Sequence, residues 1–253
     1  DASGNSTTST QTVTVVDNIN PTVVVQDITV TLDGTGSASI TFADIDAGSS
    51  DNCGIASLSI SKTTFNCSNI GYNTVKFKIV DVNSNKDSIN FIVNVKDTTR
   101  PTINTRDFTI YLDASGLANL SIDSVDLGST DVCGSVARTL TKSSFNCLNK
   151  GINTVTYSAK DVNGNITTAS LTITVLDTIY PTLSLKVATL YLDKFGSAKL
   201  NKMDIDNGSY DNCNIDSMKL SDTLFNCNQT GVNVVTVTAY DPSMNISTAT
   251  VKV

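Results

Sequence analysis

Asp17-Asn18-Ile19-Asn20-Pro21 recurs as Asp97-Thr98-Thr99-Arg100-Pro101 and again as Asp177-Thr178-Ile179-Tyr180-Pro181. Both steps span 80 residues, and no insertion or deletion interrupts them. The two cysteines of each copy keep the same period, at positions 53, 133 and 213 and at positions 67, 147 and 227. A fixed period of this length indicates a tandem array in which each repeat is one structural unit.

This period divides the 253 residues into three repeats, predicted at residues 18–97, 98–177 and 178–253. Residues 1–17 match the end of a repeat, because Asp1 to Asn5 correspond to Asp161 to Asn165. We therefore expect residues 1–17 to form the last hairpin and strand of a preceding repeat. The third repeat is expected to stop inside its own last strand.

Within one repeat the pattern predicts β-structure throughout. Short runs alternate apolar and polar residues, glycine, asparagine and aspartate separate them, and no run keeps a helical period. In the first repeat these runs are residues 22–26, 28–32, 37–42, 55–61, 74–80 and 88–95. About seven short strands in such a unit are typical of an immunoglobulin sandwich. We predict an all-β chain of tandem immunoglobulin-like Greek-key β-sandwiches, with short proline linkers that favour a linear rod.

The composition excludes several classes of function. The chain has no histidine, which removes Ser-His-Asp and Cys-His catalysis and histidine-ligated zinc. Its net charge of −7 disfavours nucleic acid and anionic membrane surfaces and favours divalent cations. No apolar run approaches the ~18 residues that a membrane span needs.

The cysteines come in pairs with thirteen residues between them. Matched pairs suggest three disulfides within repeats, joining Cys53 to Cys67, Cys133 to Cys147 and Cys213 to Cys227. Closing a ~15-residue loop is worth roughly 3 kcal/mol and implies an oxidising, extracytoplasmic location. The alternative is that the cysteines are buried free thiols, since cysteine packs well in cores.

One acidic loop of each repeat could hold a calcium ion. Carboxylates two residues apart, followed by a glycine and a further carboxylate, can wrap a hard cation. The candidate ligands are Asp44, Asp46 and Asp51 in the first repeat and Asp204, Asp206 and Asp211 in the third. The middle repeat keeps only Asp126 and Asp131 of this set, so its site is expected to be weaker. Turn and cap chemistry alone explains the first and third loops equally well, and better for the middle one.

A second group of acidic residues lies in the hairpin that begins at Asp81, Asp161 or Asp241. Each hairpin could approach the aspartate at a repeat boundary, Asp17, Asp97 or Asp177, and stiffen the joint through calcium. The spacing of aspartate and asparagine is also ordinary hairpin chemistry, which is the simpler explanation.

The order Asp51-Asn52-Cys53-Gly54, then Phe65, then Gly71-x-Asn73, then Asp97-x-x-x-Pro101 resembles the hyalin-repeat class of immunoglobulin-like domains. The variant with Asp-x-Asp-x-Gly-Ser-x-Asp-Asn-Cys is similar to repeats of giant Bacteroidota surface adhesins. This resemblance implies cell-surface display, type IX secretion and a role in adhesion or gliding motility. It also implies O-glycans at tripeptides of Asp, then Ser or Thr, then a hydrophobic residue or Thr, with candidate attachment at Ser88, Thr98, Ser124, Thr178, Ser217 and Thr223.

The sequence therefore favours a non-catalytic stalk segment of a long filamentous adhesin outside the cell. Its expected partners are neighbouring repeats, with surface polysaccharide or substratum contacted by other parts of the parent protein. Two alternatives stay open. The loops could bind a glycan or a protein, since loops carry function on such scaffolds, or the repeats could be spacers of a secreted enzyme.

Overall fold

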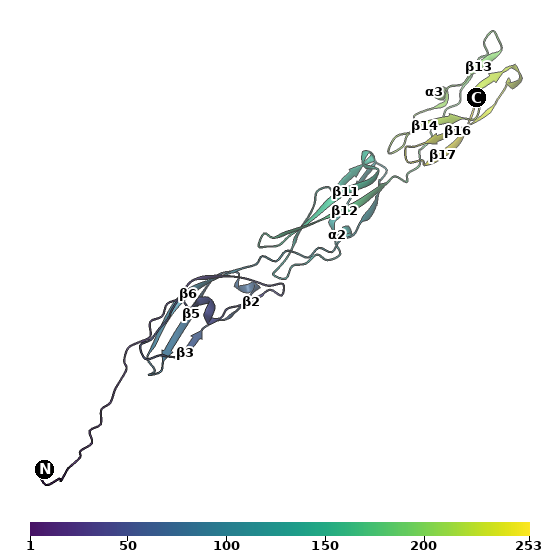
Figure 1. Ribbon diagram of the computed structural model, residues 1–253. Coiled ribbons are helices and arrows are strands. Elements are labelled where there is room, and N and C mark those ends of the chain that lie inside the picture. The colour runs from purple at the N-terminus through teal and green to yellow at the C-terminus, as the bar shows by residue number, and fades with distance from the viewer. The chain divides into compact units, whose positions relative to one another are not determined.

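The computed structural model describes residues 1–253 and consists almost entirely of short β-strands joined by turns (Figure 1). No helix in it has the length and apolar character required to cross a membrane. The chain separates into two compact units. The first comprises Asp1–Pro101, Asp131–Ser135 and Asp161–Asn165, and the second Thr102–Thr130, Val136–Lys160 and Ile166–Val253.

The first repeat is a two-layered β-sandwich. One sheet has the order β1-β6-β5-β3, with strands β1 (Ile28–Thr31), β6 (Lys86–Lys96), β5 (Gly71–Asp81) and β3 (Ile55–Ile60). The other pairs β2 (Ser37–Ser39) with β4 (Thr64–Asn66). The helical turns are α1 (Phe42–Ile45) and η1 (Cys67–Asn69). Strand β1 runs parallel to β6, with Ile28 opposite Val93, and the other pairs are antiparallel.

The second repeat has the same topology. Its sheets are β7-β12-β11-β9 and β10-β8, formed by β7 (Phe108–Tyr111), β12 (Ile166–Leu176), β11 (Gly151–Lys160), β9 (Ala137–Leu140), β10 (Ser144–Asn146) and β8 (Leu117–Asn119). Its helical turns are α2 (Ile122–Val125) and η2 (Cys147–Asn149).

The third repeat has a smaller main sheet of three strands, β14-β16-β17. Its elements are β13 (Ser197–Lys199), α3 (Lys202–Ile205), β14 (Ser217–Leu220), β15 (Leu224–Asn226), η3 (Cys227–Gln229), β16 (Val234–Tyr240) and β17 (Ile246–Lys252). Strand β13 pairs with β15. No counterpart of β1 or β7 forms in this repeat.

Each sandwich encloses its own apolar core. In the first repeat, alternate residues of β5 and β6 point inward, as in Val75, Phe77 and Val93, all at most 1% exposed. They pack with Phe65 of the opposite sheet, and Phe145 and Phe225 are buried in the same way. Burial of alternate residues from two facing sheets is the mark of a sandwich. The prediction of tandem all-β sandwiches is thereby confirmed.

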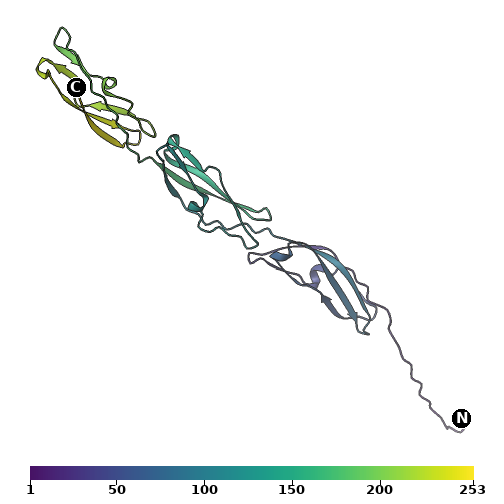
Figure 2. The same cartoon turned by 180° about the vertical axis from the view of Figure 1, so that it is seen from behind.

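Three predicted strands differ from the structure. Residues 22–26 make only isolated bridges, Thr22 with Ser50 and Val25 with Asp46. The run 37–42 is interrupted, because Thr41 and Asp44 form a capping box that starts α1. Residues 6–20 form no strand (Figures 1 and 2), since no neighbouring strand is present to pair with their N–H and C=O groups.

Candidate metal centres and disulfides between repeats

The disulfides join successive repeats. Cys67 pairs with Cys133 and Cys147 pairs with Cys213, each across a sequence separation of 66, with Cα–Cα distances of 5.1 and 5.4 Å. Cys53 and Cys227 are unpaired and exposed. The prediction that Cys53 bonds Cys67, Cys133 bonds Cys147 and Cys213 bonds Cys227 is therefore wrong in its pairing.

The two cysteines of one repeat cannot meet because they lie at opposite ends of the longest strand. Cys53 precedes β3, whose Ile55 pairs with Asp81 at the end of β5. Cys67 opens the η1 turn that leads into Gly71 at the start of β5. An 11-residue strand is about 35 Å long, whereas a disulfide tolerates a Cα–Cα distance of about 7 Å.

A glycine makes room for each cysteine of the η turns. A Cβ added to Gly36 would lie 2.8 Å from the Cys67 sulfur, and one on Gly116 would lie 2.7 Å from that of Cys147. Gly196 stands in the same relation to Cys227, at 2.7 Å. Since a side chain at these positions would displace the sulfur, glycine is required for the disulfide geometry.

Three clusters of aspartates occur at the ends of the repeats. Each contains three carboxylates whose ligand oxygens lie within 4.8 Å of one another. The clusters are Asp17 with Asp51 and Asp81, Asp97 with Asp131 and Asp161, and Asp177 with Asp211 and Asp241. In the second and third, the boundary aspartate of one repeat meets two aspartates of the next. In these two clusters, Asp131 and Asp211 lie two residues before the disulfide cysteines Cys133 and Cys213.

Turn hydrogen bonds hold one member of each cluster. The Asp161 Oδ1 accepts the N–H groups of Asn163 and Asn165, at 2.9 and 2.8 Å, and the Oδ2 accepts the Asn165 amide at 2.7 Å. The Asn163 amide also donates to Asp97 Oδ2 at 2.8 Å. Hairpin chemistry and the clustering of carboxylates, which the sequence left as alternatives, therefore operate together.

The second member keeps one carboxylate oxygen free. Asp131 Oδ1 accepts the N–H of Cys133 at 2.8 Å, while its Oδ2 is buried without a hydrogen-bond partner. The same holds for Asp211 Oδ1 and Asp51 Oδ1. A buried carboxylate oxygen with no donor is costly, and a cation would satisfy it.

In the third cluster, ionisation of one carboxyl group is also unfavourable. Burial, together with the negative charges of Asp177 and Asp241, raises the pKa of Asp211 above its usual range, although the Cys213 N–H and Lys150 oppose this. Like charges held close together make ionisation unfavourable unless a counter-charge enters. Calcium takes six to eight oxygen ligands, and carboxylates are its preferred protein donors. The donor set therefore suits calcium.

The acidic loop predicted from sequence does not assemble into one site. Asp44 Oδ2 accepts the N–H of Thr41 at 2.6 Å, and Asp46 Oδ1 accepts the N–H of Ser49 at 2.9 Å, so both make local caps and turns. Asp204 and Asp206 do the same in the third repeat. Only Asp51, Asp131 and Asp211 of the predicted ligands join a cluster.

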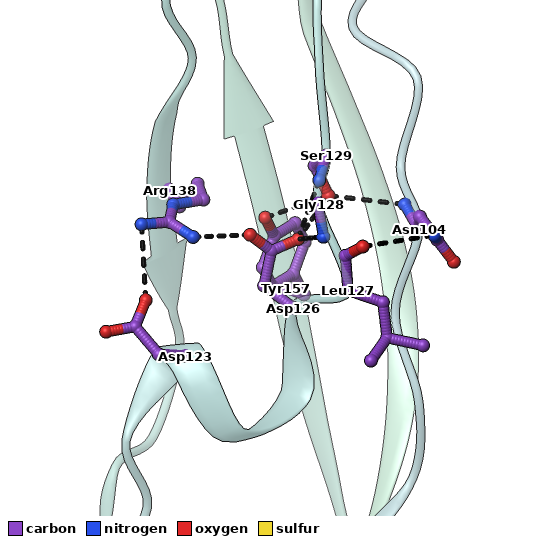
Figure 3. Close-up of polar contacts among 8 residues, drawn as sticks. All are labelled: Asn104, Asp123, Asp126, Leu127, Gly128, Ser129, Arg138 and Tyr157. Carbon is purple, nitrogen blue, oxygen red and sulfur yellow. Dashed lines mark hydrogen bonds and ion pairs between the residues drawn. The ribbon is translucent and has the colours of Figure 1, made fainter.

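Asp126 of the middle repeat belongs to a different network (Figure 3). It forms an ion pair with Arg138, which also contacts Asp123 at 3.2 Å. The Ser129 hydroxyl donates to Asp126 at 2.7 Å and lies 3.1 Å from the hydroxyl of the buried Tyr157. Burial opposes ionisation, but the donors from Ser129 and Arg138 outweigh it and hold the pKa of Asp126 well below its usual range. The negative charge of this carboxylate is thus already balanced by Arg138.

The glycan candidates differ in accessibility. Ser88, Thr98, Thr178 and Thr223 are exposed, whereas Ser124 and Ser217 are half-buried. Modification at any of them stays a prediction.

No family model and no curated protein matches the chain. The solved structures that match the chain include extracellular cadherin repeats at low identity. Domains 1–4 of protocadherin gamma B7 give 11% identity and a TM-score of 0.33, covering 90% of this chain and 73% of theirs. EC1-4 of Drosophila N-cadherin give 12% and 0.31, with coverages of 90% and 72%. EC22-24 of mouse cadherin-23 give 12% and 0.33, with coverages of 92% and 98%.

Proposed function

We propose that the chain is a non-catalytic stalk segment of a filamentous adhesin displayed outside the cell. The observation that carries this proposal is the joint between successive repeats, where the Cys67–Cys133 disulfide ends two residues from Asp131 of an aspartate cluster. Cys67 and Cys133 also pack against the core of the first repeat. The bond between them ties one repeat to the next, which is what a stalk under tension requires. The disulfides also favour an oxidising compartment.

Calcium is the ion that we propose for the aspartate clusters. Three carboxylates bring a charge of about −3 to each cluster. Asp51, Asp131 and Asp211 each have one buried carboxylate oxygen that accepts no hydrogen bond. The neighbouring Asn163 and Ser243 side chains could add neutral oxygens. With calcium bound, the boundary aspartate and the following repeat would share one ion, which would stiffen the joint.

Calorimetric titration of calcium into chelator-stripped protein tests the metal sites. We expect about three ions per chain, one for each cluster. Asp131→Asn should remove one of them, because it replaces the unpartnered oxygen of the middle cluster. Asp216→Asn, an exposed residue outside every cluster, is the matched control. Equal titrations for both variants and the parent chain would contradict the assignment.

Small-angle scattering with calcium and then with excess chelator tests the mechanical part. A particle that becomes more flexible when calcium is removed supports an ion-stiffened stalk. Identical profiles would assign the stiffness to the disulfides and linkers alone.

The finer proposal, a gliding-motility adhesin exported by a type IX system with hyalin-like repeats, is supported by the motif resemblance. Deletion of these repeats in a gliding cell should then impair movement without affecting export.

A further inference from the structure

A groove of about 640 Å³ opens in the third repeat beside α3 and the edge strand β14 (Figure 1). Its apolar lining consists of Leu200, Met203, Met218 and Leu220. Methionine side chains are flexible and adapt to apolar groups of different shapes. The groove therefore offers an adaptable apolar surface next to a strand that has a free edge.

Two sequence differences between the repeats leave this groove open. The position of Lys202 holds Phe42 in the first repeat, and the ring centre of Phe42 lies 6.2 Å from that of the buried Phe77. In the second repeat the same position holds Ile122, which packs against the core. The position of Phe77 holds the smaller Val237 in the third repeat. A smaller core residue and the loss of an apolar covering side chain together expose the groove.

Three exposed lysines also line the groove: Lys199, Lys202 and Lys219. The ion pairs of the structure are all made by Arg138, so no carboxylate neutralises these lysines. The Lys219 ammonium lies over the neutral ring of Tyr240, 5.2 Å from its centre. The equivalent positions hold Ser39, Phe42 and Ser59 in the first repeat and Asn119, Ile122 and Thr139 in the second. In a chain with a net charge of −7, this local concentration of positive charge favours an anionic ligand.

Strand β14 lies at the edge of its sheet, so no strand pairs with its outer side. The N–H of Ser221, directly after β14, donates to the Thr236 carbonyl at 2.9 Å. Because hydrogen-bonded pairs alternate along an antiparallel ladder, the main-chain N–H and C=O groups of Met218 and Leu220 point away from β16. The side chains of the same two residues line the groove. An extended peptide along this edge would therefore meet hydrogen-bond partners and an apolar surface together.

We infer that this groove binds an extended acidic peptide segment of a partner protein, which adds to the main sheet alongside β14. Apolar side chains at alternate positions of the peptide enter the groove, and its carboxylates pair with the three lysines. A fatty acid or an acidic sugar could also meet the lysines, but neither supplies the alternating N–H and C=O groups that the edge of β14 can pair with. The inference uses neither the aspartate clusters nor the disulfides, so it stands or falls separately from the calcium proposal.

Fluorescence anisotropy with a labelled peptide of four Asp-Val units, measured on the whole oxidised chain in chelator, tests the inference. We expect one peptide to bind per chain. Peptides with every valine replaced by serine, or every aspartate by lysine, should bind at least about tenfold more weakly, because each loses one part of the contact. Binding should also weaken several-fold as salt is raised, since the lysines are exposed and their charges are screened.

Variants of the chain separate the groove from the charge. Lys202→Phe introduces the residue of the first repeat and should weaken binding at least about tenfold, because the ring covers the groove. Lys202→Gln removes the same charge without filling the groove and should weaken binding only about twofold to threefold. Lys199→Glu/Lys219→Glu should weaken binding at least about tenfold. Lys76→Glu/Lys78→Glu makes the same charge change at exposed positions of β5 and is the matched control, and thermal unfolding shows whether each variant is folded.

Main-chain pairing has its own readout, because the N–H groups of alternate residues in a strand point to opposite edges. Of two peptides, one N-methylated at every valine and one at every aspartate, one should lose at least about tenfold in affinity and the other should keep it. Equal binding of these two peptides would overturn the inference, as would equal binding by Lys202→Phe and Lys202→Gln. Absence of binding by the labelled peptide would also overturn it. So would its displacement by polygalacturonate at lower concentrations than by unlabelled peptide, since the site would then suit an acidic sugar.

Discussion

Pulling the oxidised chain by its two ends should release little length from the middle repeat. Force entering at Cys67 passes through the sulfur atoms to Cys133, and force leaving at Cys147 passes to Cys213. Every residue between the members of a pair is therefore shielded from extension. Only the segment from Cys133 to Cys147 can lengthen when the middle sandwich unfolds.

The expected step sizes follow from the spacing of the bonds. About 14 residues extend to at most about 50 Å, whereas a full repeat of about 80 residues would extend to about 280 Å. Each disulfide also restricts the unfolded chain, which for a separation of 66 residues is worth roughly 4 kcal/mol in the chain-entropy model. Reduction should therefore both lengthen the steps and lower the free energy of unfolding.

Single-molecule force spectroscopy, with and without reductant, measures these steps. The double variant Cys53→Ser/Cys227→Ser keeps both joints and should give the short step of the oxidised parent chain. Cys133→Ser/Cys213→Ser removes both joints and should give full-length steps without reductant. Full-length steps in the oxidised parent chain would refute the proposed force path.

Three further predictions concern single residues. Gly116→Ala should leave Cys147 partly unbonded, seen as additional free thiol by Ellman titration, because its Cβ would displace the sulfur; normal thiol content would argue against the steric account. Asp211→Asn should raise Tm by a few degrees in chelator, because it removes a carboxylate whose pKa is raised. In calcium it should lower Tm, because it removes a ligand. A change of the same sign in both buffers would contradict the site. The pKa of Asp126 is lowered in the folded chain, so its contribution to stability is present above the unfolded value of about 3.9 and is lost as pH falls below it. Arg138→Met should reduce that acid-sensitive part in urea titrations at pH 7 and pH 3, and an unchanged difference between the two pH values would show that the ion pair is not its source.

Much of the fold could be predicted because it depends on the local alternation of apolar and polar residues. Apolar and polar residues alternate along β5, and the phenylalanine at position 65 recurs once in each repeat. Both features indicate a sandwich without any knowledge of the partner strands. The failure at residues 22–26 has a physical cause, since their N–H groups bond to Ile45, Ser49 and Ser50, in a segment that leaves a helical turn and is too irregular to form a continuous ladder with them. The sequence contains no direct signal of that neighbouring segment.

The joints were harder to predict for a related reason. Equal spacing of cysteines is satisfied by pairing Cys53 with Cys67 and equally by pairing Cys67 with Cys133, because a period does not say whether a bond stays within it. The length of β5 decides the matter, and that length is a property of the fold. Likewise Asp44 and Asp46 are close in sequence but serve caps, whereas Asp97 and Asp161 are distant in sequence and meet at a boundary.

The glycine beneath each η-turn cysteine has an evolutionary consequence. A cysteine that bonds to the next repeat needs a glycine beneath it, as Cys67 has Gly36 and Cys147 has Gly116. In diverging arrays of this kind, loss of the glycine and loss of the cysteine should therefore be inherited together. A repeat in which both have been replaced would mark an uncrosslinked hinge, so the joints along a very long array could be mapped from its sequence alone.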